Sequence, residues 1–477
     1  MDHTVRAGIR IYTCLAVRTA DRVVVGVQPS ARRNPFPDPG WRVKRWFAEP
    51  TKNMKTAAAW AAEDARAADA IAFPIAVPRP AREGGEELLA AVRADPDDIA
   101  ARLVYADWLL ERGDVRGELI RLQCELAEVP LRDPRRAAMR AREVEVLARV
   151  TSAIAGDIDG IVEACELRRG LLEGITIRAP MLAPHLARLA AVHPLRRVRI
   201  LVDNEKQFAQ LGAVAALAGI SELELCGRPK PTGRRRRVEP ASLAGTRIFA
   251  GARRLLLTDL AVDDGGWAPF LHALHAPRLR AFGLGECDAG PAELRWLATA
   301  LPEATDISVE GAHLAGDVRL LSDLARRPHL HALALRMIHT DLAPLLRDLA
   351  TDAAELAQLS LSYCTFGPAA LDALLLLLAA RPLARLALEG TDLTADVIAT
   401  LLRTRELAHV AELAINPFPD RRDHPLYLSA LLAAPPTTRI DWPWASRLRP
   451  DHLTQILAHL DLVRRRADGS VDLIAPA

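Results

Sequence analysis

Four hexads of one pattern decide the fold: LHALAL from Leu330, LAQLSL from Leu356, LARLAL from Leu383 and VAELAI from Val410. They begin 26, 27 and 27 residues apart, and each ends in two apolar residues separated by one small or polar residue. Successive side chains of a strand point to opposite faces, so the two apolar residues face a core and the residue between them faces water. The regular spacing predicts a repeat with one short strand in every unit.

The pattern extends in both directions from these four hexads. Its final apolar residue recurs at Ile177, Ile200, Leu225, Leu257, Leu284, Val309, Leu335, Leu361, Leu388 and Ile415, and Trp442 continues the series. Segments between strands, such as PAALDALLLLLAAR from Pro368, carry apolar residues at helical spacing. A proline precedes most strands and ends the helix before it. We therefore expect each repeat to consist of a parallel strand, a loop, a helix and a return.

These hexads, with a helix in every repeat, resemble the leucine-rich repeat of the longer ribonuclease-inhibitor type. The resemblance implies an α/β leucine-rich repeat solenoid over residues 167–445, with parallel strands on the concave side and helices on the convex side. It also implies that the concave side binds a partner. Family members usually place Asn or Cys three residues after the hexad; Cys287 and Cys364 fit, whereas Leu260 and Ile338 depart and predict irregular loops.

Three further regions flank the repeats. Residues 1–78 predict an N-terminal α+β unit of no recognised family, because IRIYTCLAV and RVVVGVQ favour an antiparallel strand pair and a helix-forming stretch follows residue 51. The Pro- and Gly-rich stretch PIAVPRPAREGG predicts a linker, which we place at residues 79–86. Residues 446–477 predict a C-terminal cap, with one amphipathic helix through RPDHLTQILAHLDLVRRR and then a strand.

Residues 87–166 predict a small helical domain and connecting helices. Its segments LLAAVRADPDD, LVYADWLLERGD and RGELIRLQCELA closely resemble the repeat-companion domain that accompanies leucine-rich repeats in some bacterial proteins. That family carries no established chemistry. We expect its signature positions to fix a helical hairpin by ion pairs and aromatic packing; they are Tyr105, Asp107, Trp108, Arg112, Asp114, Arg116 and Glu118.

Composition limits the cellular setting and the partners. The net charge is +2 with 26% charged residues, so no global field favours nucleic acid or an anionic membrane. Six cysteines without a CxxC pair indicate a reducing cytoplasm. The most apolar run, LDALLLLLAA, has about half the length that a membrane span needs. We expect a bacterial, cytoplasmic monomer without a signal peptide or a membrane anchor.

Catalytic motifs are missing from the sequence. It contains no GxxxxGK[ST], no GxGxxG after a strand, no HExxH and no GxSxG, so we expect no enzyme activity and no cofactor. Glu303, His329 and Glu355 fall at equivalent repeat positions, where a ladder of such ligands suits a divalent metal. A rim of solvated side chains is the better interpretation, and we predict no metal site.

The predicted partner site lies on the strands. Small residues stand between the paired apolar residues at Gly283, Ser308, Ala334, Ser360, Ala387 and Ala414, which either let a partner approach closely or only reflect an Ala-rich composition. Around this floor we predict partner-binding side chains at Asp306, Glu310, Arg336, Tyr363, Arg385, Glu389 and Glu412.

Two main functions compete at this stage. The first is a non-catalytic scaffold that binds an unidentified protein through the concave face. The alternative is a nucleic-acid or polyanion binder that uses the Arg-rich insertion GRPKPTGRRRRVEP, expected to be an exposed loop, and the basic and aromatic residues 41–46. An enzyme or GTPase-activating role, as in some ribonuclease-inhibitor-type relatives, ranks third.

Overall fold

The computed structural model divides the chain into two compact units, Met1–Arg79 and Pro80–Ala477. The residues that the structure describes are 15–16, 23–25, 42–45, 84–228, 235–262, 266–301, 303–312, 319–366, 369–391, 393–416, 432, 439–441, 450–465 and 471–473. In the first unit, β1 (Leu15–Ala16), β2 (Val23–Val25) and β3 (Arg42–Arg45) form a sheet in that order. The pair β1–β2 is antiparallel, as predicted, and β3 runs parallel to β2. The helix predicted after residue 51 lies outside the described residues.

The second unit opens with four helices: α2 (Gly85–Ala94), α3 (Ile99–Glu111), α4 (Val115–Glu128) and α5 (Arg135–Ile158). The Asp98 carboxylate caps α3 by accepting hydrogen bonds from the N–H groups of Ala100 and Ala101. Asp114 caps α4 in the same way through the N–H group of Arg116. Helix α2 begins inside the stretch that the sequence predicted as a linker.

The rest of the second unit is built on one 14-stranded sheet. Its strands, in spatial order, are β4 (Val162–Arg168), β5 (Leu171–Arg178), β6 (Arg197–Val202), β7 (Glu222–Gly227), β9 (Arg254–Thr258), β11 (Ala281–Gly285), β12 (Asp306–Glu310), β13 (Ala332–Arg336), β14 (Gln358–Ser362), β15 (Arg385–Glu389), β16 (Glu412–Asn416), β17 (Arg439–Asp441), β18 (Asp461–Arg465) and β19 (Val471–Leu473). Strands β5 to β18 are parallel, and β4 and β19 are antiparallel edge strands. The sheet is therefore open and does not close into a barrel.

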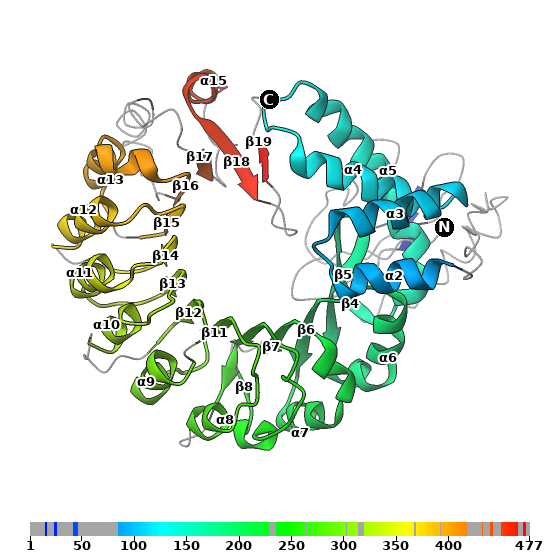
Figure 1. Ribbon diagram of the computed structural model, residues 1–477, viewed down its shortest axis with the longest axis horizontal. Coiled ribbons are helices and arrows are strands. Elements are labelled where there is room, and N and C mark those ends of the chain that lie inside the picture. Colours follow the sequence, from blue (N-terminus) through cyan, green and yellow to red (C-terminus); the bar gives the residue numbers. More distant parts are fainter. Residues whose placement is uncertain are drawn as a thin grey trace. The chain divides into compact units, whose positions relative to one another are not determined.

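Helices alternate with the strands and lie along one face of this sheet, as Figure 1 shows most clearly for α9 to α13. The helices are α6 (Ala179–Val192), α7 (Glu205–Gln210), α8 (Ala268–His272), α9 (Pro291–Thr299), α10 (Arg319–Ala325), α11 (Ala343–Asp352), α12 (Ala370–Ala380), α13 (Ala395–Leu402) and α15 (Pro450–His459), with short 3-10 turns η1 (Leu211–Ala213), η2 (Ala215–Gly219), η3 (Pro240–Leu243) and η4 (Arg405–His409). No helix in the described part of the chain is both long and apolar enough to cross a bilayer.

The core lies between the sheet and these helices. The second and fourth residues of β9 and of β11 to β16 supply it: for example, Ile307 and Val309 of β12 and Leu333 and Leu335 of β13 are at most 2% exposed. This confirms the inward-facing positions that the hexads predicted. The first, third and fifth residues consequently belong to the opposite face of the sheet, which we call the open face.

Strands β9 to β16 pair without a shift in register. Asp306 lies beside Ala332, which lies beside Gln358, which lies beside Arg385. Equivalent positions therefore form continuous rows across the open face. The first row contains Arg254, Ala281, Asp306, Ala332, Gln358, Arg385 and Glu412.

Two local predictions are wrong. The insertion is not wholly an exposed loop, because β8 (Arg236–Arg237) pairs with β10 (Leu260–Ala261) and Val238 is only 4% exposed. Residues 229–234 of the insertion lie outside the described part. The helix predicted through LDLVRRR ends at His459, because Leu462 and Val463 are buried in strand β18 and extend the sheet.

Candidate functional site

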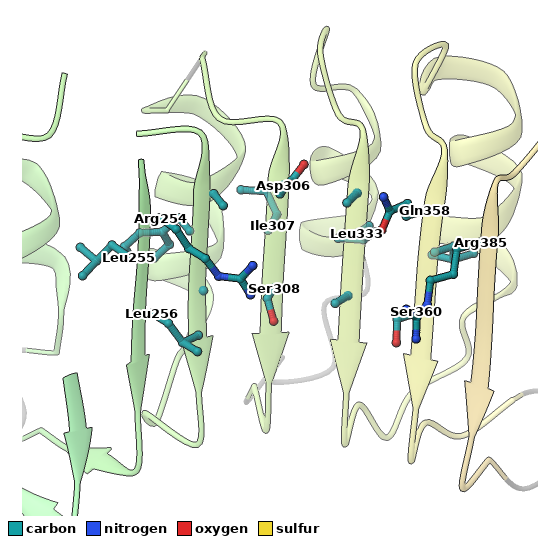
Figure 2. A pocket seen from close by; sticks show the side chains of 16 residues that line it. Arg254, Leu255, Leu256, Asp306, Ile307, Ser308, Leu333, Gln358, Ser360 and Arg385 are labelled. Carbon is teal, nitrogen blue, oxygen red and sulfur yellow. The ribbon is translucent and has the colours of Figure 1, made fainter. Parts of the chain in front are cut away.

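A shallow hollow of about 290 Å³ lies on the open face. It is lined by the first three residues of β9, β11, β12, β13 and β14 and by Arg385 of β15. Figure 2 shows that the hollow runs across the amino-terminal halves of these strands. Because neighbouring strands are about 4.8 Å apart, a hollow that crosses six strands is about 24 Å long.

Small residues at the third position of β11 to β14 form the floor of the hollow, and we call the third positions of the strands the third row. Ser308, Ala334 and Ser360 are partly accessible, whereas Gly283 is buried beneath Leu256. A Cβ atom at position 283 would lie 2.5 Å from Leu256 Cδ1, so a larger residue there would have to displace the Leu256 side chain.

The accessible floor is shorter than the sequence predicted. The third-row residues of the next two strands, Ala387 and Ala414, are 2% and 0% exposed. The expectation of an exposed small residue in every strand is therefore wrong for β11, β15 and β16. What remains accessible coincides with the hollow on β12 to β14.

Charged first-row residues stand along the amino-terminal rim of the hollow. Asp306 accepts a hydrogen bond from Thr305 Oγ1 at 3.1 Å and lies 3.7 Å from His331 Nδ1. Arg385 Nη1 lies 3.6 Å from Glu412 Oε1. Figure 2 shows the guanidinium groups of Arg254 and Arg385 extending over the sheet from opposite ends of the hollow, toward its middle.

A second group of side chains lies at the carboxyl ends of the strands. Arg336 forms an ion pair with Glu310, with 3.1 Å between Nε and Oε1, and its guanidinium carbon lies 5.0 Å from the centre of the Tyr363 ring. Partial burial raises the pKa of Glu310, although the charge of Arg336 acts in the opposite direction. Met337 and Tyr363 are 38% and 37% exposed, so an aromatic ring and a thioether are both accessible here.

The seven predicted partner-binding residues thus form two rows rather than one cluster. The amino-end row contains Asp306, Arg385 and Glu412, and the carboxyl-end row contains Glu310, Arg336, Glu389 and Tyr363. Four residues of extended chain separate the rows, which is about 13 Å.

Three residues of the site escaped the sequence analysis: Arg254, Gln358 and Met337. Arg254 and Gln358 occupy the same hexad position as Asp306 and Arg385, so the repeat alignment itself could have found them. Met337 follows β13 as the predicted Tyr363 follows β14, so the same alignment could have found it as well.

The signature residues of the companion region contact one another within α3 to α5. Tyr105 is 5% exposed and stacks on Trp108, with ring centres 6.0 Å apart, and the Arg112 guanidinium carbon lies 4.1 Å from the centre of a Trp108 ring. The ion pairs are Asp107 with Arg121, Asp114 with Arg116, and Glu118 with Arg142. These contacts support a structural role for the signature.

A buried ion pair joins these helices to the sheet. Arg102 of α3 is 0% exposed and donates to the Glu173 carboxylate of β5, and its Nε donates to the carbonyl oxygen of Pro96 at 2.8 Å. Nearby, Asp97 lies 3.1 Å from Arg196 Nη1. This ion pair could not be predicted from a local pattern, because Arg102 and Glu173 are 71 residues apart.

The described residues of the two alternative sites are already engaged within the protein, whereas Arg234 and the side chains of residues 41–46 lie outside the described part. Of the Arg-rich insertion, Arg235 Nη1 donates to the carbonyl oxygen of Glu286 and pairs with Asp288, both at 2.7 Å, and Arg236 Nε donates to the carbonyl oxygen of Arg228 at 2.6 Å. In the suggested metal ladder, Glu303 pairs with Arg280 and Glu355 with His329. Within the described residues, no group of three or more His, Cys, Asp or Glu side chains is arranged to hold a metal ion.

A search against protein-family models finds no match to this sequence, and a search of curated proteins finds none either. The structure defines the class by itself: an α/β protein with a repeated order of strand and helix, an open and mostly parallel sheet, and helices along one face.

Proposed function

We propose that residues 167–445 form a leucine-rich repeat solenoid whose open face is the concave side, and that the protein is a non-catalytic scaffold that binds a protein partner there. The observation that carries this proposal is the hollow on the open face, formed by six adjacent strands in register. We expect the scaffold to act as a monomer in the cytoplasm.

The chemistry of the open face suits a protein partner. Arginine and tyrosine dominate the energetics of protein interfaces, and methionine adapts to irregular partner surfaces. Arg336, Met337 and Tyr363 provide all three types at the carboxyl-end row. The floor adds the hydroxyl groups of Ser308 and Ser360, which are able to donate hydrogen bonds to a partner main chain.

The polyanion alternative is weaker. Arg235 and Arg236 already contact carbonyl oxygens or acidic side chains of the protein itself. Binding to phosphates would have to replace these contacts. A salt titration separates the two functions, because polyanion affinity falls steeply as salt rises.

The proposal is tested by capturing a partner from the native cytoplasm with the full chain, and then measuring its affinity for the Arg336→Ala/Tyr363→Ala double variant. We expect a loss of about 2 kcal/mol or more, which is roughly 30-fold in Kd, because both side chains are of the type that anchors interfaces. The folded fraction should stay the same, since both positions are exposed.

The matched control is Arg347→Ala/Leu376→Ala. It removes one arginine and one large apolar side chain from the exposed surfaces of α11 and α12 on the other side of the sheet. This variant should bind as wild type does. Equal affinities of the two double variants would reject the open face as the binding site.

A further inference from the structure

We infer that the hollow holds an extended, mixed-charge peptide segment of the partner protein, and that an acidic side chain of this segment pairs with Arg254. The inference rests on the proposed function and names the chemistry that the open face selects.

The first argument is the charge of Arg254. Elsewhere on the first row, Arg197 Nε pairs with Glu222 at 3.1 Å and Arg385 with Glu412 at 3.6 Å. Arg254 lies directly beside Glu222 in the sheet, but its exposed side chain has no ion pair or hydrogen bond with any residue that the structure describes.

The residue before Arg254 adds a second positive charge at the start of β9, although it does not line the hollow. Arg253 is also exposed, and its side chain likewise has no such contact within the described ranges. Arg280, whose N–H donates to the Arg253 carbonyl oxygen, is neutralised by Glu303. No described residue therefore neutralises these two adjacent arginines, and their charge favours a negatively charged group on the partner.

The second argument is the position of Asp306. It stands on the first row between Arg254 and Arg385, two strands from the former and three from the latter. These separations are about 10 Å and 14 Å. A nucleic acid carries charge on every nucleotide and would bring a phosphate against Asp306, so a uniform polyanion fits poorly. A peptide that places a basic residue at Asp306 and an acidic residue at Arg254 fits this change of sign along the row.

The third argument is the form of the hollow. It is shallow, about 24 Å long at strand spacing, and floored by Gly283, Ser308, Ala334 and Ser360. An extended peptide advances about 3.3 Å per residue, so about seven residues span it. The short floor side chains let a peptide main chain approach, and the side chain of Gln358 offers both a donor and an acceptor.

The test uses the full chain and a phage-displayed library of random dodecapeptides. We expect enriched peptides to contain more Asp and Glu than the unselected library. A synthetic copy of the most enriched peptide should bind Arg254→Glu at least tenfold more weakly than wild type. Arg347→Glu, which makes the same charge change on the helix side, should leave binding unchanged.

Replacing the acidic residue of that peptide by Lys should restore binding to Arg254→Glu but not to wild type, which assigns the contact to this pair of charges. Enriched peptides without an acidic excess, or equal affinity for wild type and Arg254→Glu, would overturn the inference. So would single-stranded oligonucleotide binding that Arg254→Glu abolishes. None of these outcomes tests the proposed function, which is tested separately by the affinity of the captured partner for the Arg336→Ala/Tyr363→Ala variant.

Discussion

The Tyr363 ring packs against Gly390, the glycine that follows the neighbouring strand β15. The residue after each of six consecutive sheet strands has a positive φ: Asp259, Glu286, Gly311, Met337, Tyr363 and Gly390. This left-handed residue turns the chain away from the sheet. Glycine is favoured at position 390 for two reasons. Its φ is 61°, and a Cβ atom there would lie 2.6 Å from the Tyr363 ring.

Gly390→Ala should therefore lower the free energy of unfolding by about 1–2 kcal/mol, since alanine disfavours left-handed backbone and its methyl group displaces the ring. Urea unfolding measures the change, and partner affinity should fall with it. Gly219→Ala is the control, because nothing lies within 4 Å of its Cβ position and its φ is not positive. An unchanged stability of Gly390→Ala would show that Tyr363 is not held by this contact.

Single residues were predictable where their partners are close in sequence. The Asp98 cap could be anticipated because the acceptor and the N–H groups it satisfies are two and three residues apart. Arg254 is the opposite case. Among the described residues it has no partner, because Glu222 pairs instead with Arg197 on another strand, and no local pattern in the sequence predicts this.

At the scale of elements, a surface ion cluster ties the α2–α3 turn to the sheet. Asp97 lies 3.1 Å from Arg196 Nη1 and 3.8 Å from both Arg168 and Arg169. Partial burial would raise the pKa of Asp97, but the hydrogen bond from Arg196 and the three positive charges outweigh it and lower the pKa. The ionised carboxylate is thus favoured by folding.

The sign of the pH effect follows from this shift. A depressed pKa means that Asp97 stabilises the fold above its ordinary pKa of about 4, and that this contribution is lost as pH falls through the lower folded value. Asp97→Asn should therefore be less stable than wild type at pH 7, by less than about 1 kcal/mol because the side chain is exposed. Urea unfolding should show the gap closing between pH 5 and pH 3. A gap that stays constant over this range would contradict the assignment.

Helices and strands were predictable where the apolar residues follow a single spacing along the sequence. The hexads located the strands because the alternation of apolar and small residues is a property of five consecutive positions. The period stops after Trp442, and LDLVRRR contains both helical and strand spacing, so its assignment depended on the free edge that β17 offers to β18. In the insertion, Val238 is buried next to the β8–β10 pair. The two strands of this pair are more than twenty residues apart, so the local composition does not predict the contact.

At the scale of the molecule, the sheet of the second unit and the helices along it share one continuous core. Leu361 is 0% exposed and lies beside Leu335 in the sheet. Leu361→Asp buries a charge without a partner and should destabilise the unit by more than about 4 kcal/mol, with loss of helix and sheet signals together. Leu376→Asp makes the same chemical change at a position of α12 that is 53% exposed, and should cost less than about 1 kcal/mol. Circular dichroism during urea unfolding measures both, and similar stabilities would contradict a continuous core.

The central claim, that the open face binds the partner, is tested most directly by site-specific photo-crosslinking. The crosslinker p-benzoylphenylalanine would replace Gln358, an exposed residue that lines the hollow, or Leu376, an exposed residue of α12 on the helix side. After irradiation in the native cytoplasm, we predict a crosslink to the captured partner from position 358 and none from position 376. A crosslink from position 376 with none from position 358 would contradict the claim and move the binding site to the helices.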